Sequence, residues 1–198
     1  IRKRIKFMKK TIIKTVIITL ASIIFAASLA VGITLAVSPK TIGKVFTKCG
    51  NYDTAAKLYE SQYKKTESVS DLIELVSMSI AADNDEMIAK YGDKLTVNYK
   101  GNMILMTSDE ERFDNYSKAT VEAYYKLGKK EDCVRVAFLS SGAYTEGNSL
   151  YYLFRLCDNK EDKDLAEEIY KYDKKNSNAI VEGKSEMQKK VKAYKEKY

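Results

Sequence analysis

The sequence predicts an all-α protein in which a single N-terminal transmembrane helix is followed by an α-solenoid of about four αα-hairpins and a C-terminal capping helix. The 25 residues from Thr15 to Pro39 carry no charge. After Pro39 the chain has no proline and few glycines, which favours helices over a β-sandwich rich in turns. Apolar landmarks then recur at helical spacing in pairs of short segments. Four parts follow from this: a basic tail (1–14), the span (15–39), the repeat domain (40–176) and the capping helix (177–198).

The apolar segment 15–39 is predicted to be a transmembrane helix. As a helix it would be ~37 Å long, enough to cross a hydrocarbon core of ~30 Å with some tilt. Residues 1–14 contain seven basic residues and no acidic one, whereas only three lysines follow the span closely. The positive-inside bias therefore places the N-terminus in the cytoplasm and everything after Pro39 outside the cell membrane. Met8-Lys9-Lys10 is typical of a bacterial start, and whether residues 1–7 belong to the native protein stays open.

The alternative to an anchor is a cleavable signal peptide, with Ala36-Val37-Ser38 as the small residues of a cleavage site. Signal peptides have apolar cores of ~7 to 15 residues, so this core favours a retained signal anchor. Ser28, Gly32 and Ala36 form a small-xxx-small stripe, which leaves a homodimer through the span open.

The charge distribution argues against nucleic acid as a partner. The net charge is +7, but of the 34 basic residues seven precede Thr15, which leaves 27 against 27 acidic residues. The part after the tail is therefore neutral and well mixed in sign, without the basic stripe of a phosphate-binding surface. The lipid bilayer is the partner that the basic tail indicates.

The sequence also argues against an enzyme and against a metal or cofactor site. It has no histidine, the commonest general base and transition-metal ligand. Neighbouring acids such as Asp109, Glu110 and Glu111 lack the spacing of a calcium loop. Cys49, Cys133 and Cys157 show no metal-ligand spacing, and we expect all three to be buried small residues, with a Cys133–Cys157 bridge left open.

The first predicted hairpin begins at Ile42. Ile42 and Phe46 lie on one face of a short helix, and Gly43 allows close approach of the partner helix. A turn at Gly50 to Asp53 follows, with Asp53 as the expected N-cap of the second helix. That helix presents a stripe whose members are Ala55 and Tyr59.

This stretch resembles the tetratricopeptide repeat, whose motif places a glycine, aromatics, a second glycine and an alanine at these offsets. The resemblance covers about one repeat well and implies an array of stacked hairpins that binds proteins. Later copies are degraded but keep their turns. Turns near Gly50, Asp83, Gly128 and Glu161 are 33, 45 and 33 residues apart, close to a repeat of ~34 with one insertion.

The three later hairpins are predicted from their apolar periodicity. The second pairs a helix around residues 72–80 with one around 87–91. The third begins at the capping-box pattern Ser108-x-x-Glu111 and turns at Gly128, and the fourth turns between Asp158 and Asp162. Residues 97–107 form the insertion, expected to pack. A helix from Ile180 to Tyr198 supplies the polar terminal cap that a solenoid needs.

The candidate partner-binding surface is the groove side of the third and fourth hairpins. In the tetratricopeptide-like register it carries polar side chains and tyrosines: Asn115, Lys118, Glu122, Tyr125, Asn148, Tyr151 and Arg155. Asn and Arg hydrogen-bond peptide groups, and Tyr offers flat area with a polar tip. We therefore expect a scaffold or adaptor for an envelope protein or peptide. The alternative is a membrane-tethered receptor for a peptide or glycan fragment in the same groove.

Overall fold

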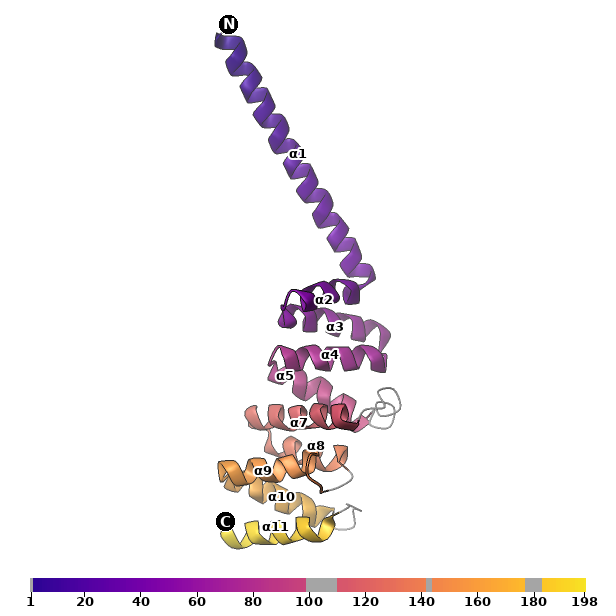
Figure 1. Ribbon diagram of the computed structural model, residues 1–198, viewed down its shortest axis with the longest axis vertical. Coiled ribbons are helices and arrows are strands. Elements are labelled where there is room, and N and C mark those ends of the chain that lie inside the picture. Colours follow the sequence, from indigo (N-terminus) through magenta and orange to yellow (C-terminus); the bar gives the residue numbers. More distant parts are fainter. Residues whose placement is uncertain (1, 99–109, 142–143, 177–182) are drawn as a thin grey trace.

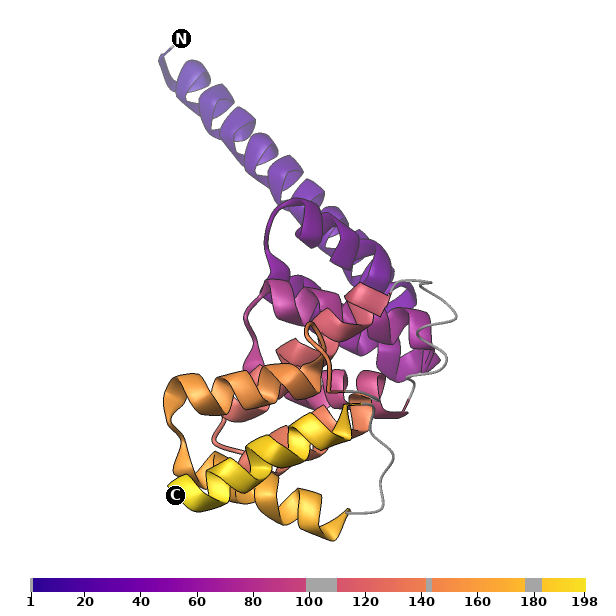
Figure 2. The same cartoon turned by 60° about the horizontal axis from the view of Figure 1, so that its bottom comes forward.

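The computed structural model describes residues 2–98, 110–141, 144–176 and 183–198, and side chains from residue 14 on, except residues 34–37 and 110. The described part is all-helical and contains no strand, which confirms the predicted class. In Figure 1 the helices follow one another in chain order from α1 to α11. Figure 2 agrees that the two termini lie at opposite ends of the molecule.

Helix α1 (Arg2–Val37) projects from the helical body and contains the apolar segment. Its residues Lys14–Ile33 are long and apolar enough to cross a membrane. Large side chains there are open to the surroundings, for example Phe25 at 70% exposure. Helix α1 ends at Val37, and Pro39 begins the next helix, where a residue without an N–H is favoured, so residues 38 and 39 of the predicted span lie beyond α1.

The remaining helices pair across short turns. Helices α2 and α3 form the first pair, α4 and the segment α5–η1–η2 the second, α7 and α8 the third, and α9 and α10 the fourth, with α11 last. The bounds are α2 (Pro39–Lys48), α3 (Tyr52–Thr66), α4 (Val69–Ala81), α5 (Asp85–Met87), η1 (Ile88–Gly92), η2 (Lys94–Asn98), α7 (Glu110–Lys126), α8 (Lys130–Ser140), α9 (Ser149–Lys160), α10 (Lys163–Lys175) and α11 (Lys184–Lys197).

Four turns, one inside each pair, share one backbone geometry. Each contains a residue with positive φ, at the positions where the sequence predicts turns: Gly50 (73°), Asp83 (50°), Gly128 (71°) and Glu161 (48°). In each, the next residue donates its N–H to the carbonyl five positions earlier, as in a Schellman motif: Asn51 to Phe46, Asn84 to Ser79, Lys129 to Tyr124 and Asp162 to Cys157, at 2.9–3.3 Å. The intervals of 33, 45 and 33 residues are therefore intervals between equivalent turns.

The residue after each positive-φ position occupies the N-cap, one position before the second helix of its pair begins. Asn51, Asn84 and Asp162 each accept a hydrogen bond from the backbone N–H three residues on, at 3.2, 3.1 and 3.0 Å. Lys129, the fourth, makes no such cap. The predicted cap at Asp53 is wrong, because Asp53 already lies in the first turn of α3, where its carboxylate pairs with Lys57 at 2.8 Å.

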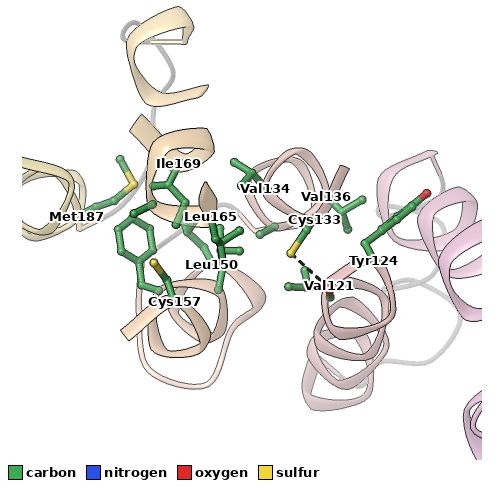
Figure 3. Close-up of a cluster of buried hydrophobic side chains, with 14 of the residues drawn as sticks. Val121, Tyr124, Cys133, Val134, Val136, Leu150, Cys157, Leu165, Ile169 and Met187 are labelled. Carbon is green, nitrogen blue, oxygen red and sulfur yellow. Dashed lines mark hydrogen bonds between the residues drawn. The ribbon is translucent and has the colours of Figure 1, made fainter. Parts of the chain in front are cut away.

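Two hydrophobic clusters lie along the body, and α7 belongs to both. One joins α3, α4, η1, η2 and the start of α7, where Phe113 and Tyr116 are buried. The other joins the end of α7 to α8, α9, α10 and α11, and it also contains Ile88 and Ala89 of η1. Figure 3 shows its middle, where Leu150 and Leu165 lie between Val121 and Cys133 on one side and Met187 on the other. Helix α7 therefore connects the two halves of the core.

Two glycines mark close helix contacts. A Cβ added to Gly43 would lie 3.2 Å from Tyr59 Cε2, so Gly43 does bring α2 close to α3 as predicted. A Cβ added to Gly92 would lie 2.1 Å from Thr120 Oγ1 on α7. Gly92 lies in a π-helical turn where the sequence predicts an ordinary helix.

Ser108, Ile180 and most of the insertion 97–107 lie outside the described residues.

Candidate partner-binding surface

The candidate surface lies on α7 and α9, which pack beside each other. A hydrogen bond from the Tyr152 hydroxyl on α9 to Glu122 Oε2 on α7, at 3.0 Å, connects the two helices. Burial, and then this bond to a carboxylate, raise the pKa of Tyr152 to about 12, so its hydroxyl remains a donor at neutral pH. Tyr152 is not among the residues predicted for this surface, although it directly follows the predicted residue Tyr151 in the sequence. Glu122 is thus held by the fold and helps to fix the two helices.

Lys126 extends this polar contact to the preceding hairpin. Its ammonium group lies 3.1 Å from Asp83 Oδ1 and 3.3 Å from Asp85 Oδ1, and 3.8 Å from Glu122 Oε1. The hydrogen bond from Lys126 to Asp83 is the main cause that raises its pKa. The second, third and fourth hairpins are therefore connected by one continuous row of polar contacts.

Tyr125 uses its hydroxyl inside the protein as well. It donates to Asp162 Oδ2 at 3.0 Å, and Lys130 donates to Asp162 Oδ1 at 2.7 Å. Burial, followed by the bond to Asp162, raises the pKa of Tyr125. Burial alone would raise the pKa of Asp162, but the bonds from Lys130, the Leu165 N–H and Tyr125 lower it. Tyr125 therefore connects α7 to the cap of α10.

Asn148 is the N-cap of α9. Its side chain accepts from the Tyr151 N–H at 3.0 Å and donates to Thr145 Oγ1 at 2.9 Å. Only 7% of Asn148 is exposed. The Tyr151 ring lies 5.6 Å from the ring of Tyr144 and is half-buried. Asn148 therefore fixes the start of α9, and with it the position of Tyr151 at the edge of the candidate partner-binding surface.

Asn115, Lys118 and Arg155 differ from their neighbours. Asn115 and Arg155 are exposed, Lys118 is half-exposed, and none makes a side-chain hydrogen bond or ion pair with the described residues. Lys118 lies one turn before Glu122 on α7, and Arg155 lies one turn after Tyr152 on α9. Because Glu122 and Tyr152 are hydrogen-bonded to each other, Lys118 and Arg155 lie on the same side of the α7–α9 pair. We call the four residues Asn115, Lys118, Tyr151 and Arg155 the α7–α9 face.

A separate cleft of about 230 Å³ lies between α10 and α11. Tyr170 and Tyr198 contribute rings to it, and Lys195 lies over the Tyr170 ring at 5.4 Å from its centre. Lys163 lies 5.8 Å from the centre of the Tyr198 ring. Asp164 and Glu167 also line the cleft, which therefore offers aromatic area flanked by charges of both signs.

The cysteines have two environments. Cys133 and Cys157 are buried free thiols, as small core residues, and the Cys133 thiol donates to the Val121 carbonyl at 3.3 Å (Figure 3). The prediction that Cys49 is buried is wrong: it lies at the exposed C-terminal end of α2. Within the described residues, histidine, cysteine and carboxylate side chains form no group able to hold a metal ion.

Comparison of the chain with models of protein families, with curated protein sequences and with solved structures finds no match.

Proposed function

We propose that the chain is a single-pass membrane-anchored scaffold or adaptor, which binds another envelope protein through the α7–α9 face. One observation carries this proposal. Asn115, Lys118 and Arg155 have no side-chain partner among the described residues, whereas the neighbouring polar groups Lys126, Tyr125 and Asp162 are paired within the protein. Arginine and tyrosine on one accessible face are typical of surfaces that recognise a partner.

The proposed architecture is a degenerate tetratricopeptide-like α-solenoid. The four equivalent turns support it, as do the side-chain hydrogen bonds that connect one hairpin with the next. Some of these bonds join residues about one repeat apart, such as Glu60 and Lys90, 30 positions apart, or Asp83 and Lys126, 43 positions apart. Contacts limited to neighbouring units are what a stacked repeat requires. Helix α11, with its exposed lysines, would then be the polar terminal cap.

The proposed location is a bacterial cell membrane, with residues 1–14 in the cytoplasm and the helical body outside. The apolar segment Lys14–Ile33 supports the anchor, since twenty residues rise ~30 Å and match a hydrocarbon core. The basic residues before it support the orientation. A dimer through Ser28, Gly32 and Ala36 remains a proposal; a Cβ at Gly32 would meet no atom within 4 Å, so that position is open to a neighbour.

A second candidate function is a receptor for a small peptide or glycan fragment, favoured by the cleft between α10 and α11. Its volume of about 230 Å³ is below the ~300–1,000 Å³ usual for ligand pockets. We therefore rank it second. Thermal stabilisation of the full chain by a small ligand, lost on Tyr170→Ala, would favour the receptor over the scaffold.

Co-purification tests the scaffold proposal. The full chain carrying Lys118→Glu and Arg155→Glu is expected to lose a protein partner that the wild-type chain retains from detergent-solubilised membranes. The matched control is Lys174→Glu with Lys189→Glu, which makes the same charge change at exposed lysines of α10 and α11. If both double variants keep the partner, or both lose it, the α7–α9 face is not the binding surface.

A further inference from the structure

The outer side of α2 carries a second surface, at the end of the body next to α1. Thr41, Lys44, Val45 and Lys48 follow the spacing i, i+3, i+4, i+7 and are all exposed, Val45 at 58%. We call these four residues the α2 face. It contains no acidic residue, and neither lysine makes an ion pair with the described residues.

The opposite side of α2 is held by the helical body. Gly43 lies against Tyr59 of α3, and Lys40 donates to Asp71 of α4 at 2.7 Å. Thr47 donates to the sulfur of Met78 at 3.2 Å, also on α4. The α2 face therefore points away from α3 and α4. Figure 1 shows α2 as the first helix of the body after α1, with the other helices beyond it.

Chain length restricts how far this face lies from a bilayer that holds α1. A helix over Lys14–Ile33 already rises about 30 Å, the thickness of the hydrocarbon core, and the four residues of α1 after Ile33 add about 6 Å. The headgroup layer on each side of the hydrocarbon core is about 5–7 Å thick. Only Ser38 separates the two helices. Helix α2 therefore begins at the depth of the headgroups.

We propose that the α2 face rests on anionic lipid headgroups of the same bilayer, with Lys44 and Lys48 binding phosphate groups and Val45 reaching the level of the acyl carbonyls. This rests on the proposed membrane anchor. Two exposed lysines beside an exposed valine match the two components of an interfacial helix, positive charge and apolar area. The contact would fix the direction in which the body extends and keep the α7–α9 face away from the lipid.

The native Cys49 provides the reporter, since it is exposed at the end of α2 whereas Cys133 and Cys157 are buried. The full chain is labelled there with an environment-sensitive fluorophore and placed in nanodiscs of phosphatidylcholine, or of an equal mixture of phosphatidylcholine and phosphatidylglycerol. A matched label goes on Cys49→Ser with Ser185→Cys, an exposed position on α11 at the far end. Emission and access of a water-soluble quencher are measured at low and high salt.

The expected result is a blue shift and protection from the quencher at Cys49 in discs that contain phosphatidylglycerol, weakened by salt and by Lys44→Gln with Lys48→Gln. The label at position 185 stays in water throughout. Lys174→Gln with Lys189→Gln is the matched control and leaves the Cys49 signal unchanged. Both double variants are checked by circular dichroism for an intact fold.

Three results would overturn the proposal. A Cys49 label that is quenched equally in both kinds of disc, in protein retained by the discs, removes the lipid contact and leaves the anchor intact. A blue shift of the Cys49 label that occurs only in discs with two copies of the chain would mean that the α2 face contacts a second copy and not the lipid. Failure of the labelled chain to remain in the discs removes the anchor, and the lipid contact with it.

Discussion

Lys129 occupies the one hairpin turn of the four whose following helix lacks a side-chain cap, and Lys129→Asn is expected to stabilise the protein. The backbone at Lys129 has φ −91° and ψ 66°, close to the −89° and 73° of Asn51, which caps α3. The side chain alone is therefore missing from a cap position that the backbone already forms. An asparagine there accepts from the N–H of Asp132, the equivalent of the bond from Thr54 to Asn51.

The expected gain is about 1 kcal/mol in the free energy of unfolding, within the ~0.5–2 kcal/mol range for N-caps. For a chain of this size, that raises the Tm by about 2–4 °C. Removal of a lysine from a helix N-terminus adds a smaller gain, because the helix dipole disfavours a positive charge there. Lys129→Ala removes the charge without adding a cap and is expected to give only this smaller gain. The difference in the free energy of unfolding between Lys129→Asn and Lys129→Ala is therefore the contribution of the cap.

The assay is urea unfolding of the full chain in mild detergent, followed by circular dichroism, with the midpoint compared at constant slope. Asn51→Ala is the reciprocal control and is expected to lose about as much as Lys129→Asn gains. Equal midpoints for Lys129→Asn and Lys129→Ala would mean that position 129 does not form a cap like that of Asn51, and that the four turns are not equivalent.

Two further predictions concern the core. Gly92→Ala is expected to lower the free energy of unfolding by about 1–3 kcal/mol, because the added Cβ would lie 2.1 Å from Thr120 Oγ1; an unchanged urea midpoint would mean that α7 does not approach η1 so closely. Burial raises the pKa of Cys133 to about 12 and that of Cys157 to about 11. A thiolate-specific reagent at pH 8 is therefore expected to modify Cys49 alone in the folded chain and three thiols after denaturation; rapid modification of two or three in the folded chain would contradict this packing.

The hairpin turns were predictable from the sequence because their requirements are local. Gly50 and Gly128 supply the positive φ without steric cost, and the polar clusters around Asp83 and Glu161 mark the other two turns. The apolar periodicity likewise predicted which side chains are buried, for example Tyr59 at 4% exposure. Both signals depend on residues within one or two helical turns of each other.

The roles that were predicted less well depend on where a helix begins or ends. Cys49 is exposed because α2 ends at Lys48, and Asn148 is a cap because α9 begins at Ser149. A shift of one or two residues in such a boundary changes a buried residue into an exposed one. The π-helical turns from Ile88 have no signature of their own, because a search at 3.6 residues per turn treats them as ordinary helix.

The most direct test of the account is photocrosslinking in cells from Asn115, an exposed position of the α7–α9 face that leaves Lys118 and Arg155 intact. The matched probe is at Lys174 on α10, and adducts are identified by mass spectrometry. We expect one dominant protein adduct from position 115, lost when Lys118→Glu and Arg155→Glu are added, and none from position 174. Equal, diffuse labelling from both positions would contradict a protein-binding face on α7 and α9.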